Sequence, residues 1–507
     1  MANIDARRAL NVPSRAPKSV ARRVVKAGKR WLYLFHRWLG VATCLLCVMW
    51  FVSGLVMLYV PFPSWSDQER IASLPAVDIA QVKVLPDEAL AKAGVSPYPS
   101  TFRLEMLGRE PVYRIVAGRE HHAVSAVTGE LVSGVGMERA SEHLSAVYPH
   151  LSHQFDRQLD YDQWTVSRRF DAHAPLYRFS LEDGLGTILY VSSRTGEIVQ
   201  NATHSERVWN WLGAIPHWIY FTPIRRDQQV WRQSVMWSSG ILAIGAFTGL
   251  WIGILRLRVR KPYKGGRVTP YRGWMKWHHL GGLVGGVFLT TWIASGWLSV
   301  NPFNLFARTQ LSQEQRIAFA GWSPASEYGV THEALASLGT SRPTDIAFSW
   351  SAGQPVMIAR NAEKLLLADP TTGTPLQIKK ASLLEAVRRV LPESRIVATE
   401  FLTREEVYWY SHHNKRPLPV IKAVFDDPAR TWLFLDPATG AIVGLSDSSA
   451  RTYRWLFNFF HDFDLPILLR NQPARDLLIW LLSIAGLVVS VSGVAIGWRS
   501  IKRSVSS

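Results

Sequence analysis

The sequence contains very little cysteine, and that scarcity limits what the chain can be. Its 507 residues include two cysteines, Cys44 and Cys47, and both lie within one apolar run. A disulfide framework is therefore excluded, and two thiols at bilayer depth do not supply the ligands of a zinc site. We interpret both as small apolar side chains that pack inside a helix.

Sequence motifs of several enzyme classes are also missing. Gly265-Gly266 lies in a loop, without the strand, glycine-rich turn and helix of a dinucleotide-binding unit. The sequence has no Ser/His/Asp arrangement and no metalloprotease helix motif. Any nicotinamide or flavin chemistry would therefore have to be supplied by a separate protein.

Acidic residues are almost absent from three segments that are rich in lysine and arginine. Nine basic residues lie in 1–30 beside Asp5, eight lie in 256–276 with no acidic residue, and three follow Trp498. These segments sum to +19, so the rest of the chain sums to −1 and the net charge of +18 lies within them. Because basic loops remain on the cytoplasmic side, both termini and the middle loop are predicted to be cytoplasmic. Charge confined to the membrane ends argues against a nucleic-acid partner.

Long apolar runs are the most prominent feature that the sequence does contain. Hydrophobic residues make up 48% of the chain, which also has 22 tryptophans. Four runs of about 20 residues carry almost no charge, which is enough to cross a hydrocarbon core of about 30 Å. They predict a membrane α-helical protein with four transmembrane helices in the lipid bilayer, the first a retained signal anchor. The runs are Trp38–Val60, Val235–Leu255, Leu280–Val300 and Leu477–Trp498.

The two halves of the chain repeat one another. Residues of the first apolar run recur 242 residues later, and residues further along recur at an offset of 244, so one two-residue gap aligns the halves. Both copies enter and leave on the same side, which predicts a pseudo-two-fold axis along the membrane normal. Matching pairs are His36/His278, Gly40/Gly282, Trp50/Trp292, Ser53/Ser295, Gly54/Gly296, Thr128/Thr372, Gly129/Gly373, Thr195/Thr439, Gly196/Gly440, Trp211/Trp455, His217/His461, Gly249/Gly493 and Gly253/Gly497.

Each half is predicted to carry an α+β domain on the far side of the membrane. Alternating runs such as 188–191 and 432–435 predict strands, and the Thr-Gly pairs predict turns in which glycine supplies a positive φ. The predicted order is a basic cytoplasmic tail (1–30), helix one (31–60), a first extracytoplasmic domain (61–206), an interfacial segment (207–230), helix two (231–255), a cytoplasmic loop (256–276), helix three (277–300), a second domain (301–450), an interfacial segment (451–475), helix four (476–498) and a cytoplasmic tail (499–507).

Four histidines lie at the ends of predicted helices, where polar side chains are costly and therefore point to function. His36 and His278 lie at the cytoplasmic ends of helices one and three. His217 and His461 lie in tryptophan-rich interfacial segments before helices two and four. Two facing imidazoles in an apolar interior suit haem, because they are strong axial ligands without net charge.

We therefore predict two haems, one between His36 and His278 and one between His217 and His461. Pairing within each repeat is the alternative. His279 follows His278 directly, but its repeat partner is Arg37, so we take His278 as the ligand and His279 as the alternative.

The histidine motif resembles a known family. His36-Arg37-Trp38-Leu39-Gly40 with its Ser53-Gly54 end, the echo at 278–282 and 295–296, and the Thr-Gly turns are similar to those of PepSY-associated transmembrane proteins. The resemblance covers nearly the whole chain from about residue 30. It implies two PepSY-like periplasmic domains, two b-type haems and a location in the bacterial inner membrane. It further implies reduction of ferric iron held in a siderophore or another chelate, which releases ferrous iron.

Aromatic and cationic side chains on the extracytoplasmic face suit a bulky, anionic ferric chelate. The predicted substrate residues are Tyr408, Tyr410, His412 and His413 in the second half, and Tyr161, Trp164 and Arg168 in the first.

Two other functions compete with a di-haem oxidoreductase supplied with electrons by a quinol or a cytoplasmic reductase. One is a peptide- or partner-binding membrane protein without redox activity. The other is a siderophore permease component, against which four helices and the lack of a span broken by glycine or proline argue.

Overall fold

The computed structural model describes residues 17–95, 98–307, 310–411 and 415–506, with side chains from Arg22 onward. The chain forms two compact units. The helical unit comprises Met1–Phe51, Trp237–Trp297 and Leu478–Ser507, and the sheet unit comprises Val52–Met236 and Leu298–Leu477. The expected combination of long apolar helices with α+β structure is confirmed.

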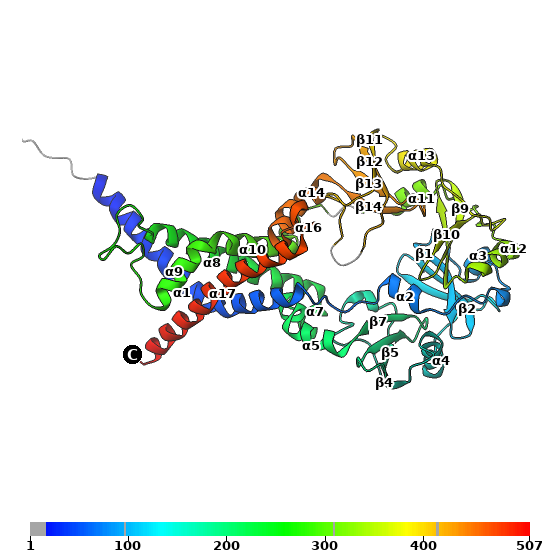
Figure 1. Cartoon of the computed structure of the whole chain (residues 1–507), viewed down its shortest axis with the longest axis horizontal. Helices are drawn as coiled ribbons and strands as arrows, with labels where there is room; N and C mark the ends of the chain where they lie inside the picture. Colours follow the sequence, from blue (N-terminus) through cyan, green and yellow to red (C-terminus); the bar gives the residue numbers. More distant parts are fainter. Residues whose placement is uncertain (1–16, 96–97, 308–309, 412–414, 507) are drawn as a thin grey trace, which may run out of the picture. The chain divides into compact units, whose positions relative to one another are not determined.

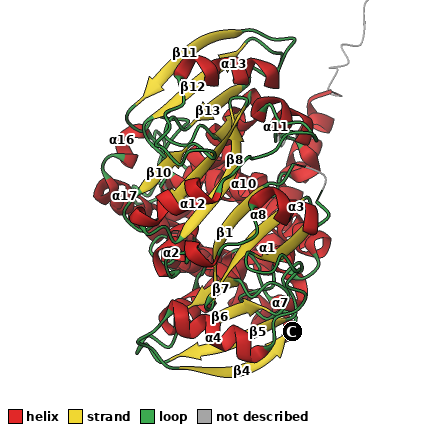
Figure 2. Ribbon diagram, turned by 90° about the vertical axis from the view of Figure 1, so that its right-hand side faces the viewer, coloured by secondary structure: helices red, strands yellow, loops and turns green. Residues whose placement is uncertain are grey.

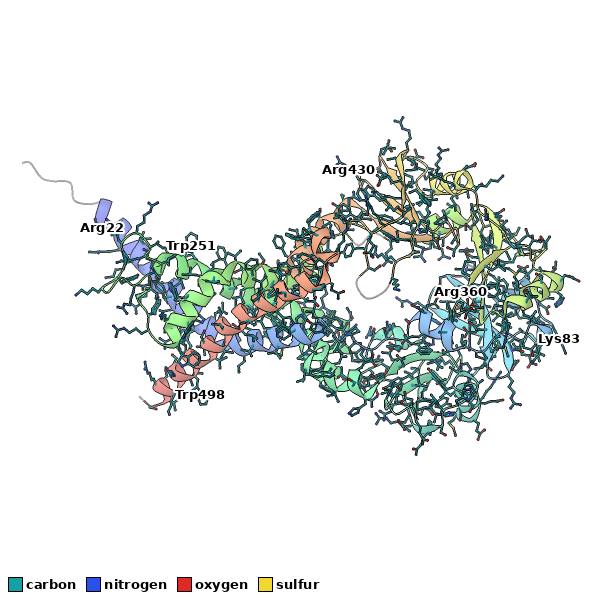
Figure 3. The ribbon with its side chains drawn as sticks, in the orientation of Figure 1. Arg22, Lys83, Trp251, Arg360, Arg430 and Trp498 are labelled. Atoms are coloured by element: carbon teal, nitrogen blue, oxygen red, sulfur yellow. The ribbon has the colours of Figure 1, made fainter. Side chains whose placement is uncertain are left out.

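Three helices are long and apolar enough to cross a membrane, namely Arg22–Met57 within α1 (Pro17–Met57), α8 (Gln228–Arg256) and α17 (Gln472–Val505). Large apolar side chains on these helices remain uncovered by protein. Trp251 on α8 is 52% exposed and Trp498 on α17 is 70% exposed (Figure 3). Such surfaces are typical of helices that contact lipid.

The predicted third span is not one straight helix. It consists of α9 (Trp274–Val284) and α10 (Gly286–Ser299), which are bent by 69° at Gly285. Helix α17 packs closely against the bend because Gly285 has no side chain. A Cβ on Gly285 would lie 3.1 Å from the Cβ of Ala485. The expectation that no span is broken by glycine is therefore wrong, and a fourth span exists where the bent pair is counted as one.

The helical unit has its own apolar core, built from α1, α8, α10 and α17 (Figure 1). Cys44 and Cys47 are both free thiols, and Cys47 is buried in this core, as expected for a packing role. The core residues are Cys47, Phe51, Leu242, Leu289, Ile293 and Val489.

Three antiparallel sheets make up the sheet unit (Figure 2). The central six-stranded sheet has the order β10-β9-β8-β1-β2-β3. Its strands are β1 (Thr101–Leu107), β2 (Glu110–Ala117), β3 (Glu120–Ser125), β8 (Asp345–Ser351), β9 (Gln354–Arg360) and β10 (Leu365–Ala368). One outer sheet, in the first half, consists of β4 (His153–Leu159), β5 (Leu176–Leu181), β6 (Ile188–Ser192) and β7 (Ile198–Ala202). The other, in the second half, consists of β11 (Ile396–Leu402), β12 (Val420–Phe425), β13 (Trp432–Leu435) and β14 (Ile442–Ser446).

The remaining helices are short and lie before, between and after these strands. The α-helices are α2 (Asp67–Ser73), α3 (Pro86–Lys92), α4 (Met137–Val147), α5 (His204–Leu212), α6 (Ala214–His217), α7 (Thr222–Arg225), α11 (Gln313–Ala320), α12 (His332–Leu338), α13 (Lys380–Val390), α14 (Ser448–Arg454), α15 (Phe460–Asp462) and α16 (Pro466–Leu469). The tighter or wider turns are η1 (Ile79–Gln81), η2 (Arg168–Phe170), η3 (Pro302–Asn304), η4 (Gly339–Ser341) and the π-helical η5 (Trp455–Phe459).

The two halves join within the central sheet. Strands β1 and β8 are repeat counterparts and pair antiparallel, with Arg103 opposite Ala347 and Leu104 opposite Ile346. One of the apolar cores packed on this sheet takes side chains from both halves, including Phe102 and Phe348, whose ring centroids are 5.0 Å apart. The domains predicted at 61–206 and 301–450 thus share one sheet and one core.

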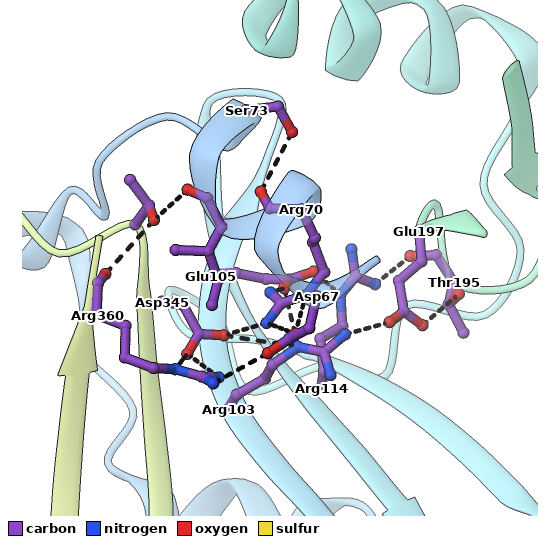
Figure 4. A network of polar contacts seen from close by, with 12 residues as sticks. Asp67, Arg70, Ser73, Arg103, Glu105, Arg114, Thr195, Glu197, Asp345 and Arg360 are labelled. Atoms are coloured by element: carbon purple, nitrogen blue, oxygen red, sulfur yellow. Dashed lines mark hydrogen bonds and ion pairs between the residues drawn. The ribbon is translucent and has the colours of Figure 1, made fainter. Parts of the chain in front are cut away.

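A network of buried charges lies where β1 meets β8 (Figure 4). Arg70 on α2 contacts Glu105 at 2.7 Å and Asp345 at 2.9 Å, so it bridges the two halves. Asp345, which is fully buried, also accepts from Arg360 at 2.5 Å. The complete network has four arginines, Arg70, Arg103, Arg114 and Arg360, and four carboxylates, Asp67, Glu105, Glu197 and Asp345.

The arginines keep the carboxylates of this network ionised. Burial alone would raise the pKa of Glu105, but the guanidinium groups of Arg103 and Arg114 hold it well below its ordinary value. Glu197 behaves in the same way, since the same two arginines lower its pKa despite burial. Each buried charge is therefore compensated by its neighbours, which is the condition under which burial is tolerated.

We expect Asp345→Ala to lower the free energy of unfolding by about 3–5 kcal/mol, because Arg70 then lies buried without that carboxylate. Urea titration of the detergent-solubilised chain, followed by tryptophan fluorescence, measures the change. Glu142→Gln is the control, since Glu142 pairs with exposed Arg109 at 3.5 Å and should change stability by less than about 1 kcal/mol. Equal effects of the two substitutions would contradict a structural role for the network.

Candidate functional site

The structure brings the four predicted histidines together as two pairs of repeat partners. His36 on α1 and His278 on α9 have ring centroids 6.3 Å apart. His217 at the end of α6 and His461 on α15 have ring centroids 6.2 Å apart. In both pairs the partners come from different halves, and pairing within a repeat is not what the structure has.

The two rings of the first pair are held by equivalent contacts. His36 Nδ1 lies 3.1 Å from the carbonyl oxygen of Gly245 and 3.3 Å from Thr248 Oγ1. His278 Nδ1 lies 3.1 Å from the carbonyl oxygen of Val489 and 3.2 Å from Ser492 Oγ. A carbonyl oxygen can only accept, so Nδ1 carries the proton in both rings and Nε2 keeps its lone pair.

Glycine makes room for the first pair. A Cβ on Gly249 of α8 would lie 2.6 Å from His36 Cε1, closer than side-chain carbons approach. At the repeat position Gly493 of α17, a Cβ would lie 3.6 Å from His278 Cε1, which is ordinary contact. The ring of His36 therefore packs directly on the backbone of α8.

His279 does not belong to this pair. Its Nε2 lies 3.1 Å from the carbonyl oxygen of Gly253, to which it must donate, and its ring packs against Tyr271. Nε2 of His279 therefore carries a proton and has no lone pair for a ligand, unlike Nε2 of His278.

The second pair lies among the interfacial segments. His217 Nδ1 is 3.0 Å from Ser53 Oγ, and a Cβ on Gly54 would lie 3.3 Å from His217 Cε1. His461 follows the π-helical η5 and stacks on Phe457 with ring centroids 5.0 Å apart. Such wide turns are frequent at functional sites because they reorient one side chain of a helix.

Two of the predicted substrate residues line a surface cavity. Tyr161 and Arg168 lie there with Arg226, whose guanidinium is 4.1 Å from the Tyr161 ring centroid. Trp164 does not line this cavity, since it is buried against Phe170 and other side chains of the core. The full lining is Tyr161, Arg168, Thr222, Pro223, Arg226 and Asp227, around about 500 Å³.

The predicted substrate residues of the second half are engaged elsewhere. Tyr408 accepts a hydrogen bond from Trp455 Nε1 at 3.0 Å, and Tyr410 donates one to Asp464 at 2.6 Å. Burial, followed by the contact with Asp464, raises the pKa of Tyr410, so it remains a neutral donor. His412 and His413 lie outside the described residues.

A second cavity, of about 570 Å³, occupies the position in the second half that corresponds to the first cavity. Arg470 takes the place of Arg226, and Pro466 that of Thr222. Neither arginine is among the predicted substrate residues, although the offset of 244 residues that aligns His217 with His461 also aligns them. The cavity is lined by Phe401, Leu402, Thr403, Arg404, Glu405, Glu406, Val407, Pro466 and Arg470.

Neither a protein-family model nor a curated protein matches this chain. The resemblance to PepSY-associated proteins therefore stays a prediction.

We expect Gly249→Ala to destabilise the chain by about 1–3 kcal/mol, because the added methyl group must displace His36 from its contact with Gly245. Gly493→Ala is the matched control at the repeat position, where the space already admits a methyl group. Thermal unfolding of both variants in detergent, compared with the natural chain, tests this difference. Equal midpoints for the two variants would contradict it.

Proposed function

We propose that this protein is a di-haem b oxidoreductase of the PepSY-associated transmembrane family, located in the bacterial inner membrane. It transfers electrons to ferric iron held in a periplasmic siderophore or another chelate and so releases ferrous iron. The observation that carries this proposal is the convergence of repeat-related histidines into two pairs with ring centroids 6.3 and 6.2 Å apart.

The residues present fit haem. Two imidazoles that share one iron have ring centroids about 6 Å apart, because each metal–nitrogen bond is about 2 Å long and the nitrogen lies about 1 Å from its ring centroid. Both separations agree with this value. In the first pair, hydrogen bonding at Nδ1 leaves Nε2 as the ligand atom, which is the usual arrangement of a metal-bound histidine.

His36 and His278 would hold one haem and His217 and His461 the other. When bound, haem supplies one-electron transfer. The protein contributes neutral ligands, which cost less to place in an apolar interior than charged ligands do. It also holds three of these rings through a second nitrogen, by Gly245 and Val489 in the first pair and by Ser53 at His217.

The proposed topology follows the distribution of charge. The basic segments 1–30, 256–276 and 499–507 would lie in the cytoplasm, with α1, α8, α17 and the bent pair α9–α10 as four spans. The sheet unit would then lie in the periplasm. A quinol or a cytoplasmic reductase would deliver electrons from a separate molecule.

Two repeat-related cavities support a chelate-binding role for the sheet unit. Each contains an arginine at the same place, Arg226 or Arg470, and the first adds Arg168 and the ring of Tyr161. Guanidinium groups bind carboxylate, hydroxamate or catecholate oxygens through directed hydrogen bonds, and aromatic rings add contact area. Cavities of this volume match drug-sized ligands.

A siderophore permease is the second candidate, favoured by the break between α9 and α10. Broken helices are typical of the substrate sites of transporters. A permease requires no haem, and the paired histidines would then be dispensable.

We expect the purified protein to show a Soret band and sharp reduced α and β bands, because each histidine pair ligates one haem. His36→Ala and His217→Ala should each remove about half of the haem, measured by pyridine haemochrome. His279→Ala is the control and should retain both haems, since its Nε2 is bonded to Gly253. Colourless protein from haem-replete cells would exclude the proposal and favour a binding or transport role.

We expect Arg226→Ala to raise the KM for an anionic ferric chelate about tenfold, because one charge-assisted hydrogen bond is lost from the cavity. Reduction is followed with a ferrous-iron indicator in proteoliposomes supplied with a chemical reductant. Arg157→Ala, on the exposed strand β4 outside the cavity, is the control. Arg470→Ala is the corresponding variant of the second cavity and is measured in the same assay. Unchanged KM in both arginine variants would place the substrate elsewhere.

A further inference from the structure

Two histidines and a glutamate from separate segments converge in the first half of the sheet unit. His121 lies on β3, His173 follows η2, and Glu197 directly precedes β7. One ligand atom of each lies within 4.8 Å of the other two. The two imidazole rings stand nearly perpendicular, with centroids 4.7 Å apart. None of the three takes part in the histidine pairs described above.

One polar atom of this cluster has no hydrogen-bond partner among the described residues. Among the described residues, His173 Nδ1 is buried without a hydrogen-bond partner, and it lies 4.0 Å from Glu197 Oε2. A buried nitrogen without a partner is unfavourable and usually indicates an ion, a water or a functional role.

Hydrogen bonds hold both carboxylate oxygens of Glu197. Its Oε1 accepts from Arg103 at 2.6 Å, and its Oε2 accepts from Thr195 Oγ1 at 3.0 Å (Figure 4). The second lone pair of Oε2 remains for the side that faces His173. Hydrogen bonds of this kind orient the carboxylate ligands of metal sites. Glu105 compensates the charge of Arg103 and Arg114 beside it.

The internal repeat provides a comparison within the same chain. The turn that presents Glu197 is preserved in the second half, since Gly196 and Gly440 both have positive φ, of 74° and 69°. At the same offset of 244 residues, however, the positions of His121, His173 and Glu197 hold Leu365, Pro417 and Ala441. The fold is therefore built equally well without these side chains.

We propose that His121, His173 and Glu197 form a binding site for a divalent first-row transition-metal ion. Two imidazole nitrogens and one carboxylate oxygen are the donor set that binds Fe(II) or Zn(II) with one or more positions left open. Bond lengths of about 2.1 Å require ligand atoms about 3.4 Å apart in a tetrahedral site, so small side-chain rotations complete it. Burial lowers the pKa of both histidines, which favours the neutral imidazole, in which one ring nitrogen has a lone pair for a metal. The proposal does not rest on the haem-binding function.

The test is metal binding to the full-length protein, purified in detergent with a tag that contains no histidine and freed of metal with a chelator. Titration with Co(II) should produce visible absorption from one ion per chain. Calorimetry with Zn(II), and with Fe(II) under anaerobic conditions, should give the same stoichiometry. His173→Ala should weaken binding on the order of 100-fold, a loss at least as large as those caused by removing residues that only orient ligands.

His122→Ala is the matched control, since His122 neighbours His121 on β3 and instead faces Glu120 at 3.4 Å. Its affinity should equal that of the natural chain. Glu197→Gln is a second test variant, which keeps a side-chain oxygen that can accept from Arg103 but removes the negative charge. Absence of binding to the natural chain, or equal affinity in His173→Ala, Glu197→Gln and His122→Ala, would overturn the proposal. Haem content, measured in the same samples, reports separately on the histidine pairs.

Discussion

The buried charge network at the junction of β1 and β8 determines how the two halves of this chain can combine. Arg70 from one half requires Asp345 from the other, and Asp345 also binds Arg360. A buried charge that loses its partner is strongly unfavourable, so these contacts admit one register of the two halves. The central sheet depends on that register, because β1 and β8 are joined by backbone pairing at Arg103 and Leu104. The network also extends, through Arg103, to Glu197 in the turn before β7.

Symmetry and asymmetry in the repeat have different consequences. Where the halves match, they supply equal contributions to a shared feature: His36 and His278 are held by Gly245 and Val489, which are themselves repeat partners. The contacts that hold such a pair all come from the two copies of the repeated unit. Where the halves differ, one has acquired chemistry that the fold does not need, as with His121, whose counterpart is Leu365. The duplicated chain can therefore serve as its own reference when residues are sorted into structural and functional ones.

Close packing against glycine occurs both at the first histidine pair and at the bend between α9 and α10. Gly249 lets the ring of His36 lie on the backbone of α8, and Gly285 lets α9 and α10 bend near Ala485 of α17. In each case a methyl group would occupy space that the neighbour already fills. Glycine content in the apolar runs was apparent from the sequence, but whether each glycine serves a ring, a bend or a helix contact depends on which atoms approach it.

The sequence by itself determined the features that short-range patterns control. Apolar runs of sufficient length predicted α1, α8 and α17, and the offset between halves predicted that His36 would meet His278 and His217 would meet His461. The tertiary structure alone decided the shared central sheet, the bend at Gly285, the burial of Trp164 and the convergence of His121, His173 and Glu197. These depend on contacts between residues far apart in the chain, which periodicity does not encode. A pattern repeats along one dimension, whereas a site forms from whichever side chains packing brings to one place.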